Sequence, residues 1–255
     1  MNVFARSPLP RRVLDSIGLL LVRLGLKRAC PVKRPEGRPE RVDTKVSHPV
    51  FARWLSLLAP KLDEKGAAEH RAELLDGVSG RVIEVGAGTG LNFRHYPETV
   101  TGVVAVEPEP YLRAKAEGAA SEASVAIDVV DGVADRLPAA DASFDVAVAS
   151  LVLCSVPDQA AALAEIRRVL RPGGELRFYE HVAADEPGLA RLQGSVAWFW
   201  PWLGGGCHPN RDTVAAIEAA GFAAERCERF SFRPSPLDAP VSPHVIGIAR
   251  VPWRP

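Results

Sequence analysis

The chain has few cysteines, and none of them has the spacing of a metal site. Its four cysteines are Cys30, Cys154, Cys207 and Cys227, and no Cys-x-x-Cys motif occurs. The six histidines also lack the short spacings at which zinc ligands recur. We therefore expect no structural metal.

A long apolar run and a secretory signal are missing too. The apolar stretch from Ile17 to Val22 is not followed by a small-residue cleavage site. The charged residues Asp15 and Arg23 lie on either side of this run. The run is therefore too short to cross a membrane, because a membrane-spanning helix needs about 20 apolar residues. The sequence therefore predicts a cytoplasmic protein whose cysteines need not be oxidised.

The chain has no net charge, because 31 Lys and Arg balance 31 Asp and Glu. The two signs are unevenly distributed: residues 1–45 hold 11 basic and 4 acidic residues, so the remainder holds 20 (31 − 11) and 27 (31 − 4). Enzymes of nucleic acids more often carry basic residues across the ligand-binding face. We expect a small-molecule acceptor and no nucleic acid.

The basic N-terminal segment has the pattern of an amphipathic helix. Residues 11–28 place apolar side chains at helical spacing among arginines and lysines, which favours peripheral contact with an anionic membrane. Packing onto the domain, or disorder, would fit the same pattern. Residues 30–44 combine three prolines with many charges and resemble a linker. We therefore divide the chain into residues 1–45, helix and linker, and residues 46–255, one catalytic domain.

Strand and helix patterns alternate through the catalytic domain. Helices are expected at 49–59 and 63–76, as a lid or flank, and at 211–220. Strands are expected at 81–86, 101–107, 125–130, 144–150, 175–182, 223–232 and 244–251. The last two strands have no helix between them. We predict an α/β fold with a doubly wound, mostly parallel seven-stranded sheet that ends in an antiparallel hairpin.

A glycine-rich turn follows the first predicted strand. Val82, Ile83 and Val85 suit a strand covered on both faces, and Gly86, Gly88 and Gly90 come directly after it. Glycines allow the backbone to turn tightly and to approach a ligand closely. The turn predicts a nucleotide-like ligand, but its third glycine comes one residue too early for the dinucleotide motif G-x-G-x-x-G.

The second strand ends in an acid, Glu107, which lies 21 residues after Gly86 (107 − 86). A carboxylate at this point can accept hydrogen bonds from both hydroxyls of a ribose. NAD and an adenosyl cofactor both carry such a ribose, so Glu107 leaves both cofactors open.

Further motifs separate these cofactors. Glu84 gives the turn the form E-x-G-x-G-x-G, residues 131–138 read DGVADRLP before SFDV at 143–146, and residues 166–176 read IRRVLRPGGEL. In this order the motifs resemble class I S-adenosylmethionine-dependent methyltransferases. The resemblance implies S-adenosyl-L-methionine as cofactor, with glycines 173 and 174 ending a helix.

The same resemblance implies a set of cofactor-binding residues. Val133 departs from the pattern, because this position commonly carries an acid that binds the adenine amino group. Asp135 or the backbone near Ala134 would make that contact instead. The implied residues are Glu84, Gly86, Ala87, Gly88, Gly90, Glu107, Pro108, Val133, Ala134, Ser150 and Leu151.

A narrower resemblance rests on other segments. Residues 151–156 read LVLCSV, 179–182 YEHV, 206–208 GCH and 243–247 PHVIG. These are similar to the alkyl-thiol S-methyltransferases of the methyltransferase-like family, which implies methylation of a small thiol. Three alternatives stay open: an O-, N- or C-methyltransferase of a small molecule, quinone or lipid; an NAD-dependent reductase; and a silent membrane-associated binding module. The oligomeric state is left open.

Methyl transfer requires an acceptor atom aligned about 3 to 3.5 Å from the sulfonium methyl. A thiol must react as the thiolate, so a nearby base would help. We predict His181 as this catalytic base, because it ends the fifth strand, where open sheets bind ligands; an orienting or packing role beside Glu180 is the alternative. Cys154 is expected to shape the site rather than to act as a nucleophile. Residues predicted to contact the acceptor are Cys154, Trp198, Trp202, His208 and His244.

Overall fold

The computed structural model describes residues 49–253. The predicted basic helix at 11–28 and the linker at 30–44 lie outside the described residues. Within the described part, no helix is both long and apolar enough to cross a membrane.

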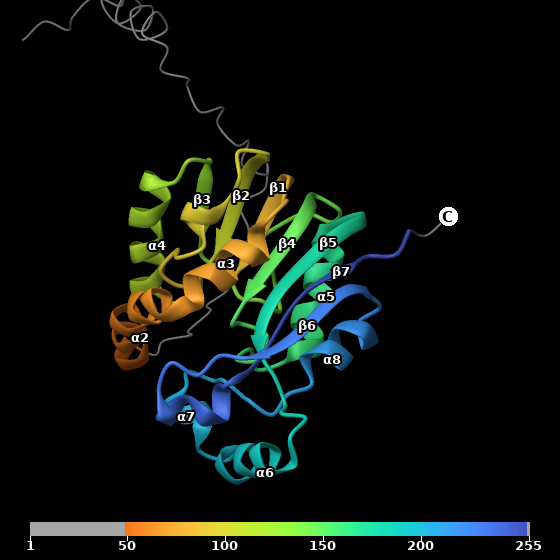
Figure 1. The fold of residues 1–255 in the computed structure, drawn as a ribbon. Helices are drawn as coiled ribbons and strands as arrows, with labels where there is room; N and C mark the ends of the chain where they lie inside the picture. Colours follow the sequence, from red (N-terminus) through yellow and green to blue (C-terminus); the bar gives the residue numbers. More distant parts are fainter. Residues whose placement is uncertain (1–48, 254–255) are drawn as a thin grey trace, which may run out of the picture. The chain divides into compact units, whose positions relative to one another are not determined.

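Seven strands form one sheet in the order β3-β2-β1-β4-β5-β7-β6 (Figure 1). Strands β1 to β5 pair in parallel, whereas β7 is antiparallel to both β5 and β6. The sheet confirms the predicted fold, including the final hairpin. The strands are β1 Gly80–Val85, β2 Val100–Val106, β3 Ile127–Val130, β4 Phe144–Ser150, β5 Leu170–His181, β6 Ala223–Ser231 and β7 Pro243–Arg250.

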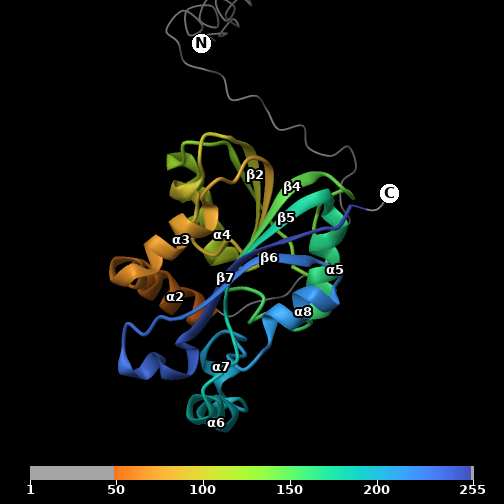
Figure 2. The same cartoon turned by 45° about the vertical axis from the view of Figure 1, so that its right-hand side comes forward.

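Helices cover both faces of the sheet (Figures 1 and 2). Val82 of β1 belongs to a core with Leu74 and Ala116, whereas its neighbour Ile83 belongs to a core with Ile166 and Ile217. Successive side chains of a strand point to opposite faces, so two covered faces explain the uninterrupted apolar run in β1. The helices are α2 Pro49–Leu62, η1 Asp63–Ala67, α3 Ala68–Leu75, η2 Phe93–His95, α4 Pro110–Glu122, α5 Gln159–Val169, α6 Pro187–Val196, α7 Trp200–Leu203, α8 Thr213–Ala219 and η3 Pro236–Val241.

The glycines of the R-P-G-G segment do not end helix α5, so this prediction was wrong. The helix ends at Val169, and Leu170 is already extended and pairs with Phe144 of β4. Gly173 has a φ of 77° and turns the first part of β5, where an added Cβ would meet the ring of Trp253. Burial of Leu170 next to β4 starts the strand early, before the glycines are reached.

Candidate active site

The glycine turn lies where β1 ends, and its three glycines all have left-handed backbone angles. A Cβ on Gly86 would lie 2.4 Å from Cγ2 of Val152, and a Cβ on Gly90 would lie 2.7 Å from the Phe93 ring. A Cβ on Gly88 would meet no atom within 4 Å. Protein packing therefore requires glycine at two positions, whereas Gly88 faces the open space in which a ligand can approach the backbone.

Glu107 joins the glycine turn to the end of β2. Its carboxylate accepts hydrogen bonds from the backbone N–H groups of Gly88, at 2.8 Å, and Glu109, at 2.9 Å. A carboxylate has about four acceptor positions, so this one can still accept from two ribose hydroxyls. The open space at Gly88 and this carboxylate fit the adenosyl part of S-adenosylmethionine. Pro108 follows at the same edge of the sheet.

The affinity for cofactor should depend on pH through Glu107. Burial raises the pKa of this carboxyl to about 7. The ribose hydroxyls donate to the ionised form, so binding favours deprotonation. Affinity should be highest above pH 7 and should fall as the pH drops below it, by up to about tenfold per unit.

Calorimetry with S-adenosylhomocysteine between pH 5.5 and 8.5 measures this dependence. Glu107→Gln should bind weakly and with a flat pH profile. A pH dependence that survives in Glu107→Gln would assign it to another group, such as Glu84, whose pKa burial also raises to about 7.

Glu84 faces protein groups rather than open space. Its carboxylate accepts from Nδ2 of Asn92, at 2.9 Å, and from the hydroxyl of Tyr96, at 2.7 Å, and its side chain is buried. Both contacts lie in the segment that follows the glycine turn. Glu84 therefore holds the segment from Asn92 to Tyr96 in place through these two hydrogen bonds.

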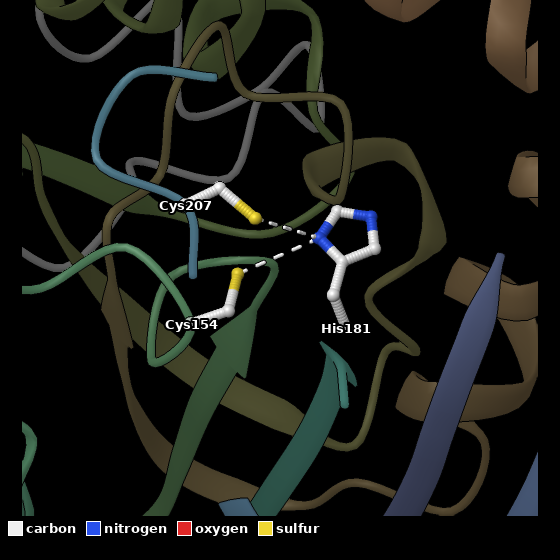
Figure 3. A group of neighbouring side chains, drawn as sticks. All are labelled: Cys154, His181 and Cys207. Atoms are coloured by element: carbon white, nitrogen blue, oxygen red, sulfur yellow. Dashed lines mark hydrogen bonds between the residues drawn. The ribbon is translucent and has the colours of Figure 1, made fainter. Parts of the chain in front are cut away.

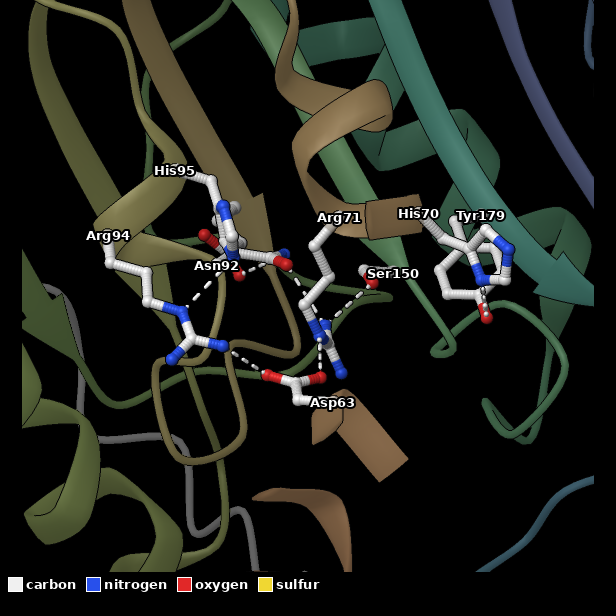
Figure 4. Close-up of polar contacts among 9 residues, drawn as sticks. Asp63, His70, Arg71, Asn92, Arg94, His95, Ser150 and Tyr179 are labelled. Atoms are coloured by element: carbon white, nitrogen blue, oxygen red, sulfur yellow. Dashed lines mark hydrogen bonds and ion pairs between the residues drawn. The ribbon is translucent and has the colours of Figure 1, made fainter. Parts of the chain in front are cut away.

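Arg71 of α3 reaches the end of β4, and the sequence analysis missed it (Figure 4). Its Nη1 donates to Oδ1 of Asn92, at 2.9 Å, and to Oγ of Ser150, at 3.2 Å, while its Nε pairs with Asp63 at 3.0 Å. Ser150 is one of the residues that the resemblance implies for cofactor binding, so Arg71 beside it is a candidate to bind the carboxylate of the methionine part of the cofactor. An arginine on a helix gives no such signal in the sequence, because its partners meet it only in space.

Replacing Arg71 by methionine should weaken cofactor binding selectively. S-adenosylhomocysteine should lose about tenfold in affinity, as expected for a charged hydrogen bond of roughly 1.5 kcal/mol. 5′-Methylthioadenosine, which lacks the carboxylate, should bind both proteins equally well. Equal losses for the two ligands, measured by calorimetry, would instead indicate a general disturbance of the site.

The remaining predicted cofactor residues lie in the loops after β1, β3 and β4. Ala87 is buried within the glycine turn, and Val133 and Ala134 are half-buried after β3. The Val133 carbonyl accepts from the N–H of Arg136 at 3.1 Å. Leu151 has a φ of 58°, which is strained for a residue with a side chain, and its N–H donates to Tyr179.

Two cysteines and a histidine meet beyond the ends of β4 and β5 (Figure 3). The Sγ atoms of Cys154 and Cys207 each lie 3.5 Å from Nδ1 of His181. Both cysteines are buried, and His181 is half-buried. The hydrogen bond from Cys154, together with His181, lowers the pKa of Cys207 to about 5, while the pKa of Cys154 is raised. Burial lowers the pKa of His181, but the nearby Cys207, Glu180 and Asp238 raise it by more.

Hydrogen bonds hold the loops of this cluster in place. The buried carboxylate of Glu180 accepts from the backbone N–H groups of Val152, Leu153 and Cys154, at 3.0, 2.8 and 3.0 Å. The N–H of His208 donates to the Cys154 carbonyl at 2.8 Å. A Cβ on Gly206 would lie 2.7 Å from the carbonyl oxygen of Ser155, so only glycine allows the two loops to approach this closely.

The structure brings some of the predicted acceptor residues together and leaves others apart. His244 pairs with His181 across β5 and β7, the two rings lie 4.6 Å apart, and burial lowers the pKa of His244 to about 3. Trp198 and Trp202 are each 85% exposed, and they do not join the cluster. Acceptor contact by these two tryptophans stays a prediction.

Comparison with known proteins shows the family to which the chain belongs. Residues 83–178 match the family described as "Methyltransferase domain". The human thiol S-methyltransferase TMT1B is 37% identical over 211 residues, which cover 78% of this chain and 85% of that protein. Human thiol S-methyltransferase TMT1A is 36% identical, covering 68% and 72%. A SAM-dependent methyltransferase from Thermotoga maritima has a similar fold, with a TM-score of 0.58 and 22% identity over 79% of this chain and 98% of that one.

The fold, the glycine turn and these matches define an S-adenosylmethionine-dependent methyltransferase of class I. Within that class, the chain belongs to the family of the TMT1 thiol S-methyltransferases. S-adenosyl-L-methionine is its cofactor, and its acceptor is a small molecule. The NAD-dependent and non-enzymatic alternatives are not favoured.

Proposed function

We propose that the protein methylates the sulfur of small, apolar thiols. The observation that carries the proposal is the cluster of Cys154, His181 and Cys207, whose Cys154 loop packs against the glycine turn. Val152, two residues before Cys154, packs against Gly86. The loop that carries Cys154 therefore contacts the turn that binds the methyl donor. The relatives whose names specify thiols support the same acceptor.

The residues of the site divide the work of an in-line displacement. Gly88 and Glu107 would bind the adenosyl part and Arg71 the carboxylate of S-adenosylmethionine, whose sulfonium supplies the methyl group. The acceptor sulfur would lie at the cluster, where the rigid loops restrict its motion. Such positioning can supply a large part of the rate acceleration, because the acceptor must be aligned with the methyl group.

His181 is the catalytic residue of the proposal. As a base it would take the proton of the acceptor thiol, only a few per cent of which is ionised at neutral pH. His181→Ala should then lower turnover more than cofactor affinity, and the turnover of the unchanged protein should vary between pH 6 and 9. Turnover that is constant over this range would contradict a role as base.

An assay with labelled S-adenosylmethionine tests the acceptor. Hydrogen sulfide, short alkyl thiols, phenols and quinols are offered in parallel, and the labelled product is identified by mass spectrometry. Transfer to the thiols is expected. Transfer only to oxygen or carbon would contradict the proposal and favour a different acceptor on the same scaffold.

We also propose a cytoplasmic location with peripheral membrane contact through residues 11–28. The support is their basic amphipathic pattern. Flotation with anionic vesicles compares the full chain with a chain that lacks residues 1–28. Equal flotation of the two chains would remove the membrane role of this segment.

A further inference from the structure

Three potential ligand atoms, from two loops and from the end of strand β5, converge at the acceptor end of the site. The Sγ atoms of Cys154 and Cys207 and Nδ1 of His181 all lie within 4.8 Å of one another (Figure 3). We propose that these side chains bind a zinc ion, and that the acceptor thiolate is its fourth ligand. The fourth ligand rests on the proposed function, whereas the zinc site itself does not.

The two sulfur-to-nitrogen distances match those of a tetrahedral zinc site. Zinc lies about 2.3 Å from a cysteine sulfur and about 2.0 to 2.1 Å from a histidine nitrogen. With tetrahedral angles, these bonds place sulfur and nitrogen about 3.6 Å apart. Both sulfurs lie 3.5 Å from Nδ1 of His181, which matches this value, and the two sulfurs lie within 4.8 Å of each other.

Hydrogen bonds satisfy these three atoms only through shared and long contacts. Nδ1 carries either one lone pair or one hydrogen, so it serves one of the two sulfurs well, and the other sulfur depends on the hydrogen bond between the two cysteines and on the Ser155 hydroxyl, 3.5 Å from Sγ of Cys154. Both cysteines are nevertheless buried and directed at the same nitrogen. A cation shared by all three atoms would satisfy the whole cluster.

The ligand set also indicates which metal is bound and how it is used. Thiolate and imidazole together favour zinc over magnesium or calcium, which prefer oxygen ligands. Two cysteines and one histidine form one of the sets that hold catalytic zinc, with the fourth position left for a substrate. The contacts of Glu180 and Gly206 fix the two cysteine loops before any ion binds.

The proposed step balances without an oxidant or a reductant. The acceptor thiol releases its proton to water when its sulfur joins the ion. A lone pair of that sulfur then forms the bond to the methyl carbon, while the electron pair of the broken bond stays on the donor sulfur, which becomes an uncharged thioether. The methylated acceptor is a weaker ligand and leaves. With zinc bound, the ion activates the thiol in place of His181, whose role as base then belongs to the metal-free site.

Cobalt provides a direct test of the zinc site. The full chain, kept reduced and stripped of metal, is titrated with cobalt(II) and then with zinc(II). We expect one cobalt per chain, with sulfur-to-cobalt charge-transfer absorption and the visible bands of a tetrahedral site, displaced by zinc. Absence of the sulfur-to-cobalt absorption would overturn the proposal whether or not any variant folds.

Cysteine variants then locate the ion. Cys154→Ser and Cys207→Ser should each bind cobalt at least about 100-fold more weakly, whereas Cys227→Ser, at an exposed cysteine of β6, should bind it unchanged. All three should keep their affinity for S-adenosylhomocysteine, which shows that they fold. Folded variants of Cys154 and Cys207 with undiminished cobalt binding would overturn the site.

Turnover separates the zinc site from the proposed function. Thiol methylation should fall at least tenfold in the metal-free protein and return with zinc. Equal turnover without metal would overturn the fourth-ligand role of the acceptor. A zinc-loaded protein that binds metal as described but methylates no thiol would support the site and contradict the proposed function.

Discussion

Gly88→Val should abolish measurable cofactor binding while leaving the protein folded. A Cβ at this position meets no protein atom within 4 Å, so the valine side chain would project into the space that the ligand needs. We expect affinity for S-adenosylhomocysteine to fall by at least about 100-fold, equivalent to about 2.7 kcal/mol. Calorimetry of the folded variant measures the loss.

A matched control separates this loss from backbone strain. Gly77 lies in the turn between α3 and β1, has a φ of 69° against 57° at Gly88, and also has no atom within 4 Å of an added Cβ. Valine in this left-handed region should destabilise either variant by about 1 to 2 kcal/mol in urea unfolding. Only Gly88→Val should lose the cofactor. Similar losses in both variants would mean that strain, not occupation of the site, is responsible.

Much of the fold could be predicted from the sequence because its signals are local. The apolar run from Val82 to Val85 predicts a strand covered on both faces. The lack of an α-helical pattern between the last two strands predicts the hairpin, although the short 3-10 helix η3 in that connection was not predicted. The R-P-G-G segment failed because a long-range contact, the pairing of Leu170 with Phe144, decides where the strand begins. Local turn chemistry contains no information about that partner.

The site also contains residues that local spacing predicts and residues that meet only in the folded protein. The glycine turn and Glu107 lie within one βαβ unit, so their spacing along the chain is informative. Cys154, His181 and Cys207 are separated by 27 and 26 residues, and no short spacing marks them as a cluster. Their convergence depends on β4 and β5 lying side by side and on the loop that returns after α7. All three residues or their motifs could therefore be named from the sequence, but not their meeting at one point.

The largest loss of stability is expected from Glu180→Gln. Glu180 has no exposed surface, and its two oxygens accept three backbone N–H groups of the loop after β4. Glutamine keeps one accepting oxygen and places an NH2 group against the third N–H. The N–H of Cys154 and the new NH2 group are then buried donors without an acceptor, and the charge is lost, so the free energy of unfolding should fall by about 2 to 4 kcal/mol.

Turnover of the Glu180→Gln variant should fall as well, because the released N–H belongs to Cys154 and a displacement of about 1 Å can lower a rate on the order of 100-fold.

Glu175→Gln is a suitable control: the residue lies at the other end of β5 and pairs with Arg177 and Arg250. Its loss should be about 1 kcal/mol, with turnover unchanged. Urea unfolding and thiol methylation measure the two effects. If Glu180→Gln keeps both stability and turnover, the loop does not depend on this carboxylate, and Cys154 must be positioned by the His208 contact instead.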